Sequence, residues 1–239
     1  MASGPSSSVA IVRVAVVITR VSLCYPRAVG TRAAFITIGQ SPRSDILDEL
    51  RAWWPADLEI EECGALDHLS REDIHALAPT GDEPRLVSRL TDGTEATMRA
   101  TAIHERISEI VERCDRVPYD FLVLLCTGAF DELRSRHLLL KAQPIVDHGV
   151  AAFASGSTQV GVLVPLAHQI PPSATIASHA SPYEGDRWAD AARELAPADL
   201  IVMHCMGYSE AMRQKMATLT GTPVLLARRL LGAAVAQLL

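Results

Sequence analysis

The fold is decided by Leu122-Val-Leu-Leu-Cys126-Thr-Gly128, which has a counterpart in Leu200-Ile-Val-Met-His-Cys205-Met-Gly207. In both stretches an apolar run leads to a cysteine, directly in the first and after His204 in the second, and a glycine-containing turn comes next. Apolar runs of this length are typical of strands buried on both faces of a parallel sheet. The pattern therefore predicts two similar α/β units, each with a strand, a cysteine at its C-terminal end and a helix after the turn.

Short apolar runs and helical patterns alternate through the rest of the chain, which predicts βα units and parallel sheets. The further strands are expected at 33–38, 58–61, 160–164, 175–178 and 224–226, and the helices at 84–90, 102–115, 188–195, 212–219 and from 227 onward. After the first strand, Ser41 is predicted to cap a helix that has Pro42 as its first residue. Ligands bind at the C-terminal ends of parallel strands, which is where both cysteines are expected.

Composition narrows the class of protein. The 239 residues carry a net charge of −6, so nothing in the bulk charge favours binding of nucleic acid. The five cysteines show no zinc-like spacing and no C-x-x-C motif, which predicts reduced thiols and a cytoplasmic location. The eight histidines form no ligand cluster and no G-x-G-x-x-G motif is present, so we expect neither a metal nor a dinucleotide.

Residues 1–32 differ from the remainder. They are rich in Ser and Val, lack acidic residues and contain four arginines, of which Arg13 and Arg20 interrupt the apolar run. That interruption excludes a membrane span. An Arg-rich, acid-poor segment is compatible with a transit peptide, and the alternative that we favour is an extension without a role in the fold. We expect this extension to be disordered or loosely packed.

Cys126 and Cys205 are the candidate reactive groups. A thiol at a helix N-terminus would have a lowered pKa, because unpaired amides and the helix dipole stabilise its thiolate. The amides of Thr127, Gly128, Met206 and Gly207 could hold a carboxylate. A substrate between two such thiols could lose a proton to one face and regain it on the other, which is two-base racemisation. The alternative for each cysteine is an ordinary buried side chain.

The remaining cysteines are expected to be structural. Cys114 lies on an apolar helix face, and Cys24 falls in the N-terminal extension. The acidic neighbours of Cys63 should raise its pKa. His204 directly precedes Cys205, so strand alternation predicts that it points to the opposite side.

Several motifs together resemble the AroM family over residues 33–239. They are Ile36-Thr-Ile-Gly39-Gln40-Ser41-Pro42-Arg43, Gly64-Ala-Leu-Asp67, Leu69-Ser-Arg-Glu72, Leu86-Val-Ser-Arg-Leu-Thr-Asp-Gly93, Leu124-Leu-Cys126-Thr-Gly128, Val160-Gly-Val-Leu-Val-Pro165, Met203-His-Cys205-Met-Gly-Tyr208 and Pro223-Val-Leu-Leu226.

The resemblance implies kinship with aspartate, glutamate and hydantoin racemases, arylmalonate decarboxylases and maleate isomerases. That superfamily has two pseudosymmetric Rossmann-like α/β lobes with parallel sheets, a cleft between them, an active-site cysteine from each lobe and no cofactor. Carried over, it places residues 33–140 and 226–239 in the first lobe with Cys126, and residues 141–225 in the second with Cys205. The racemases usually have Asn-Thr after the first cysteine and Thr after the second. Here Thr127-Gly128 and Met206 stand there, which puts an amino-acid substrate in doubt.

Further candidates for substrate binding surround the predicted cleft. Gly39, Gln40, Ser41 and Arg43 follow the first strand, and Arg43 could pair with a substrate carboxylate. The alternative for Arg43 is a solvated side chain on a first helical turn. His168 and Gln169 could reach the cleft from the second lobe, and Thr37 could line it.

These observations predict a cofactor-independent racemase or isomerase that acts on a small carboxylate, with Cys126 and Cys205 as acid and base. One alternative uses a single cysteine for decarboxylation or cis–trans isomerisation. Another is a non-catalytic small-molecule binding or regulatory protein linked to aromatic amino-acid metabolism. The sequence leaves open whether the protein catalyses a reaction or only binds a ligand. It also leaves open whether the chain forms a homodimer. It favours no nucleic-acid or membrane partner.

Overall fold

The first sheet contains four parallel strands and belongs to the N-terminal part of the chain. The computed structural model describes residues 30–154, 156 and 158–239, so the predicted extension over residues 1–32 lies almost wholly outside the described residues. The order of the strands across the sheet is β2-β1-β5-β6. Their bounds are Arg32–Thr37 for β1, Glu59–Gly64 for β2, Phe121–Leu124 for β5 and Leu138–Lys141 for β6.

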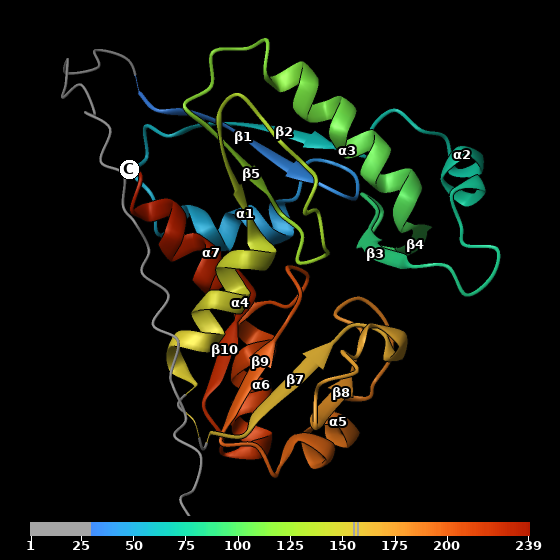
Figure 1. Ribbon diagram of the computed structural model, residues 1–239, viewed down its shortest axis with the longest axis vertical. Helices are drawn as coiled ribbons and strands as arrows, with labels where there is room; N and C mark the ends of the chain where they lie inside the picture. The colour runs from blue at the N-terminus through green and yellow to red at the C-terminus, as the bar shows by residue number, and fades with distance from the viewer. Residues whose placement is uncertain (1–29, 155, 157) are drawn as a thin grey trace, which may run out of the picture.

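The second sheet repeats this design with the order β10-β9-β7-β8, again with parallel pairs. Its strands are β7 (Val160–Val164), β8 (Ile176–His179), β9 (Leu200–Met203) and β10 (Val224–Leu226). Figure 1 shows the two sheets in separate lobes, one above the other. The predicted fold class, two α/β lobes with parallel sheets, is therefore confirmed.

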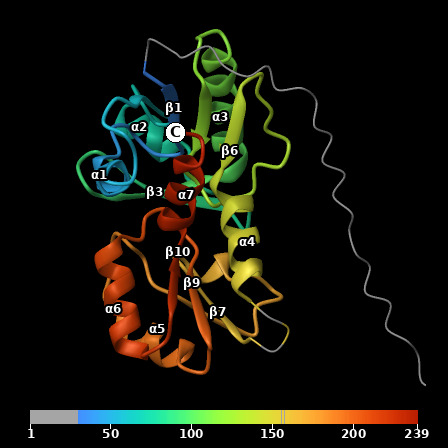
Figure 2. The same ribbon diagram turned by 90° about the vertical axis from the view of Figure 1, so that its left-hand side faces the viewer.

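Helices cover both faces of the sheets. In Figures 1 and 2, α3 lies on one face of the first sheet, while α1 and α7 lie on the other and α4 runs between the lobes. The second sheet packs against α5 and α6. The helices are α1 (Ser44–Arg51), α2 (Arg71–Ala76), α3 (Ala100–Cys114), α4 (Ala142–Phe153), α5 (Trp188–Leu195), α6 (Glu210–Thr220) and α7 (Ala227–Ala236), with a short 3-10 turn at Ala167–Gln169. None of the helices described is long and apolar enough to span a bilayer.

A hydrophobic core joins the two lobes. Phe35 and Val123 of the first sheet share one buried cluster with Val202 and Met206 of the second lobe and with Leu231 of α7. The helix α7 follows the last strand of the second sheet yet packs against α1. This shared core fixes the two lobes relative to each other, and therefore fixes the cleft between them.

The predicted helix at 84–90 is wrong. Residues Arg85–Arg89 form strand β3, which pairs with the antiparallel strand β4 (Glu95–Arg99) in a separate hairpin. Gly93 in the connecting turn has φ +91°, a conformation that favours glycine. The Asp92-Gly93 pair is a hairpin signal that outweighs the weak helical pattern of this segment.

Candidate active site

A cavity of about 510 Å³ lies between the lobes, and both Cys126 and Cys205 line it. Each cysteine follows the last residue of a central strand by two positions, Cys126 after β5 and Cys205 after β9. Thr127, Gly128, Met206, Gly207 and His168 from the predicted set also line the cavity. The equivalent strand ends of the two lobes thus bring the two thiols to one space.

The two cysteine turns have the same local geometry. The Gly128 amide donates a hydrogen bond to Cys126 Sγ at 3.3 Å, and the Gly207 amide donates to Cys205 Sγ at 3.3 Å. The hydroxyl of Thr127 donates to the His204 carbonyl at 3.2 Å, which ties the first turn directly to the second. The glycine two residues after each cysteine therefore supplies an amide to the sulfur, and one bond holds the turns together across the cleft.

The predicted helix after Cys126 is absent. Residues 127–137 form turns and irregular structure up to β6, and after Cys205 the next helix begins only at Glu210. The expected lowering of both thiol pKa values by helix N-termini is therefore wrong. Burial raises the pKa of the Cys126 thiol to about 12, and it also raises the pKa of Cys205.

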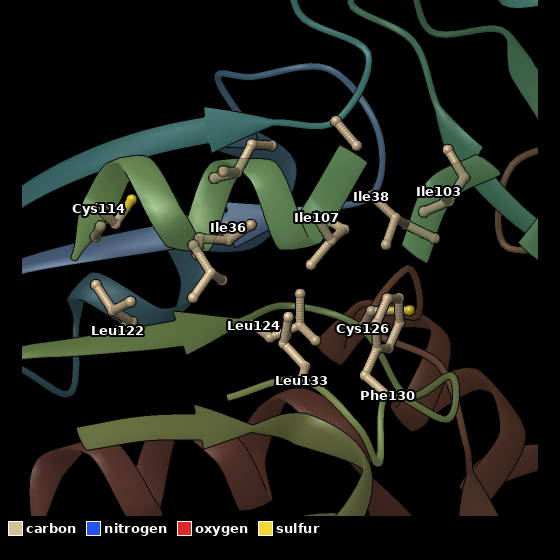
Figure 3. Close-up of a cluster of buried hydrophobic side chains, with 14 of the residues drawn as sticks. Ile36, Ile38, Ile103, Ile107, Cys114, Leu122, Leu124, Cys126, Phe130 and Leu133 are labelled. Carbon is tan, nitrogen blue, oxygen red and sulfur yellow. The ribbon is translucent and has the colours of Figure 1, made fainter. Parts of the chain in front are cut away.

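The surroundings of the two thiols differ. Cys126 is only 7% exposed and belongs to the core cluster beneath α3, where Figure 3 shows it beside Phe130. Cys205 is less buried. The positive charges of Arg43 and Arg228 oppose the effect of burial on the pKa of Cys205, whereas Arg43 is the one arginine that opposes it at Cys126. Cys205 is therefore the thiol that ionises more readily.

Arg43 is buried in the site and donates hydrogen bonds to several of its side chains. Only 4% of this residue is exposed, so it is not the solvated arginine of the alternative interpretation. Its Nε and Nη2 donate to the two carboxylate oxygens of Asp45 at 2.8 Å, and Nη2 also donates to Tyr183 Oη at 3.4 Å. Its Nη1 donates to the hydroxyls of Thr37 and Ser88. All five N–H donors of the guanidinium therefore have partners within the protein.

Tyr183 and Ser88 are site residues that the sequence did not indicate. Both line the cavity and both accept a hydrogen bond from Arg43. Because the arginine occupies a lone pair of each hydroxyl, the hydroxyl protons remain free to point elsewhere. Burial and the nearby Cys205 raise the pKa of Tyr183, so its phenol stays protonated and can donate a hydrogen bond.

His204 does not point away from the site. It lines the cavity, and its Nε2 lies 2.9 Å from Asp147 Oδ1. The alternation rule fails because β9 ends at Met203, one residue earlier. His168 also lines the cavity, where burial and nearby Arg85 lower its pKa and favour the neutral imidazole.

Gly39, Gln40 and Ser41 lie outside the cavity wall and interact elsewhere. Gln40 Oε1 accepts from the amide of Thr91 at 2.9 Å. The predicted N-cap at Ser41 is wrong, since α1 begins at Ser44 and the Ser41 hydroxyl donates to Asp67 at 2.7 Å. These residues shape the loop that carries Arg43, and their predicted contact with substrate stays a prediction.

Cys63 and Cys114 lie in the core of the first lobe and do not line the cavity. The expected increase in the pKa of Cys63 is wrong in direction. A hydrogen bond from the Cys114 thiol lowers the pKa of Cys63 and outweighs both burial and the nearby Glu61. In the part of the chain that the structure describes, no group of three or more metal-ligating side chains is present.

Solved structures of racemases and a decarboxylase share this two-lobed fold. Allantoin racemase from Klebsiella pneumoniae matches with a TM-score of 0.53 and 14% identity, over 87% of this chain and 87% of that one. Aspartate racemase from Picrophilus torridus matches with a TM-score of 0.51 and 12% identity, over 87% and 94%. An arylmalonate decarboxylase matches with a TM-score of 0.51 and 13% identity, over 87% and 91%. The chain therefore has the fold of the racemase-like superfamily.

The sequence model of the AroM family, described as AroM protein, matches residues 33–239. The chain belongs to the AroM family. No curated protein matches its sequence.

Proposed function

We propose that this AroM family protein is a cofactor-independent racemase or isomerase of a small carboxylate, with Cys205 as base and Cys126 as acid. The proposal is carried by one observation, which is that a thiol from each lobe lines the same cavity between the sheets. A carbon atom bound between them would have a sulfur on each side. General acid–base catalysis of this kind contributes on the order of 100- to 10,000-fold to a rate.

The proton would move from one thiol to the other through the substrate. The Cys205 thiolate takes the proton from the carbon next to the carboxylate, and the electron pair of the broken C–H bond passes into the carboxylate as an enolate. The Cys126 thiol then donates its proton to the opposite face of that carbon, which forms the inverted product and leaves Cys126 as a thiolate. Proton exchange with water restores the starting state.

Charges and donors around the cavity support this assignment. Arg43 and Arg228 favour the thiolate of Cys205, while burial keeps Cys126 protonated. The Tyr183 hydroxyl, oriented by Arg43, can donate to a carboxylate or enolate oxygen. The valines of the second lobe, Val160 and Val162, offer an apolar wall to the remainder of the substrate.

The unequal burial of the two thiols favours a second candidate. A single thiol, Cys205, could protonate the enolate left when a carboxylate departs as carbon dioxide, and Cys126 would then be part of the wall. The two candidates differ in whether Cys126 is required. Binding without catalysis would require neither thiol.

Exchange of substrate hydrogen for deuterium tests the proposal. We expect the protein in deuterated water to exchange and invert one class in a panel of amino acids, aryl acids and 2-oxo acids. Cys126→Ala and Cys205→Ala should each reduce inversion at least about 100-fold. Cys114→Ser, outside the cavity, is the control and should retain activity. Mass spectrometry and chiral chromatography measure both quantities.

Inversion that survives in both cysteine variants would overturn the two-thiol proposal. Decarboxylation of a malonate that is lost in Cys205→Ala but retained in Cys126→Ala would establish the one-thiol alternative. Absence of any turnover across the panel, with saturable binding of a carboxylate, would leave a binding protein.

A further inference from the structure

Arg228 is a buried arginine behind the turn that carries Cys205. It lies on the first turn of α7 and only 2% of it is exposed. Unlike Arg43, it does not line the cavity, and two of its hydrogen bonds go to the backbone of the turn. Burying an arginine costs free energy unless its charge and its N–H donors have partners, so the position of Arg228 requires an explanation.

The guanidinium of Arg228 binds the Cys205 turn on one side and α1 on the other. Its Nε donates to the Met206 carbonyl at 2.6 Å, and its Nη2 donates to the Gly207 carbonyl at 3.0 Å. Its Nη1 donates to the Asp45 carbonyl at 2.6 Å and lies 3.0 Å from Glu49 Oε2. The planar guanidinium thereby clamps a turn of the second lobe to a helix of the first.

Asp45 connects the two buried arginines of the site. Its carboxylate receives both bonds from Arg43 and lies 3.9 Å from Arg228 Nη2. Two positive charges thus lie beside one partly buried carboxylate, with the more exposed Glu49 at the edge. The positive charges of both arginines lower the pKa of Cys205 against the effect of burial.

We propose that Arg228 is a positioning residue for Cys205, which fixes the cysteine turn through two carbonyls and supplies charge that stabilises the thiolate. This role rests on the proposed function of Cys205 as a base. Arg228 does not line the cavity between the lobes and contacts the turn instead. It acts through the geometry and ionisation of Cys205.

Other charged and titratable groups also face Cys205 and must remain constant in a test. Arg43 opposes the rise in the pKa of Cys205, and Glu95 adds to it. The other titratable groups that interact with Cys205 are Cys126, Tyr183 and Tyr208. His204 and Asp147 line the same cavity.

The test measures how the rate at which Cys205 reacts with hydroxyethyl disulfide, a small neutral reagent, depends on pH. Peptide mass spectrometry resolves each cysteine. In Arg228→Met, the thiolate of Cys205 should form at higher pH and react about tenfold more slowly at pH 8, while the profile of Cys126 stays in place. Arg229→Met is the matched control, since Arg229 is the half-exposed neighbour on the same helix and should leave Cys205 unchanged.

A second variant, with the opposite expected effect on the reactivity of Cys205, keeps the test valid if Arg228→Met does not fold. Glu49→Gln removes the carboxylate that partly neutralises Arg228, so Cys205 should react faster than in the unaltered protein. An unmoved Cys205 profile in both variants, or an equal shift of Cys126, would overturn the role of Arg228. Since no substrate is used, failure of the exchange panel with a shifted Cys205 profile would reject the proposed function alone.

Discussion

The reaction rate of Cys126 with a small neutral disulfide is expected to rise about 1000-fold between pH 7 and pH 10, without a plateau. Only the thiolate reacts, and burial raises the pKa of this thiol to about 12, so its thiolate fraction grows tenfold for each pH unit. An ordinary thiol with a pKa near 8.5 would gain only about 30-fold over the same range and then level off. Stopped reactions analysed by peptide mass spectrometry measure the profile.

Cys205 provides the internal comparison for this profile. Its pKa is also raised by burial, but Gly207, Arg43 and Arg228 oppose the shift. Cys205 should therefore level off at a lower pH than Cys126 in the same sample. A plateau for Cys126 below pH 10, or one that precedes the plateau of Cys205, would contradict the assignment of Cys126 as the acid.

Arg43→Met is expected to destabilise the protein by about 3 kcal/mol, the lower end for breaking a buried ion pair. The change removes both bonds to Asp45, and it removes one hydrogen bond from each of the hydroxyls of Thr37, Ser88 and Tyr183. We choose the lower end because the Asp45 side chain is 22% exposed and Arg228 remains near it. Urea unfolding followed by circular dichroism measures the loss.

The pH dependence of this loss has a defined sign. Hydrogen bonds and charge from Arg43 lower the pKa of Asp45 in the folded protein against the opposing effect of burial. This stabilisation is present above the unfolded pKa of about 4 and is lost as pH falls through the lower folded value. The gap between Arg43→Met and the unaltered protein should therefore narrow below about pH 4.

Arg32→Met is the control for the arginine substitution. Arg32 pairs with Glu61 at 2.8 Å, but their side chains are 40% and 48% exposed, so its loss should cost less than about 1 kcal/mol. Equal losses of unfolding free energy in the two variants would contradict a stabilising role for the buried Arg43. So would a difference between Arg43→Met and the unaltered protein that widens in acid.

The sequence predicts the elements that apolar patterns define. The strand 160–164 and the helix 188–195 agree with the structure residue for residue, because a continuous apolar run and an amphipathic face are local signals. The pattern at 84–90 predicts a helix where the structure has β3, since the short strands of this hairpin are only partly buried and lack a clear alternation.

The cysteines of the site could be predicted, but their environment could not. Strand ends place Cys126 and Cys205, and the family resemblance relates them to each other. Their pKa shifts depend on packing between the lobes, which reverses the direction expected from a helix N-terminus. The burial of Arg43 and Arg228 depends on long-range contacts, of Arg43 with Tyr183 and of Arg228 with Asp45. Charge alone predicts exposure for both arginines.

Where the deuterium enters tests the central claim most directly, namely that two thiols act on opposite faces of one carbon. One enantiomer of the acid that exchanges would be incubated in deuterated water and sampled during the first tenth of the reaction. Two bases predict deuterium in the inverted product while the recovered starting enantiomer still carries hydrogen. Equal labelling of both enantiomers from the first samples would mean that a single base serves both faces, and the account of Cys126 and Cys205 would be wrong.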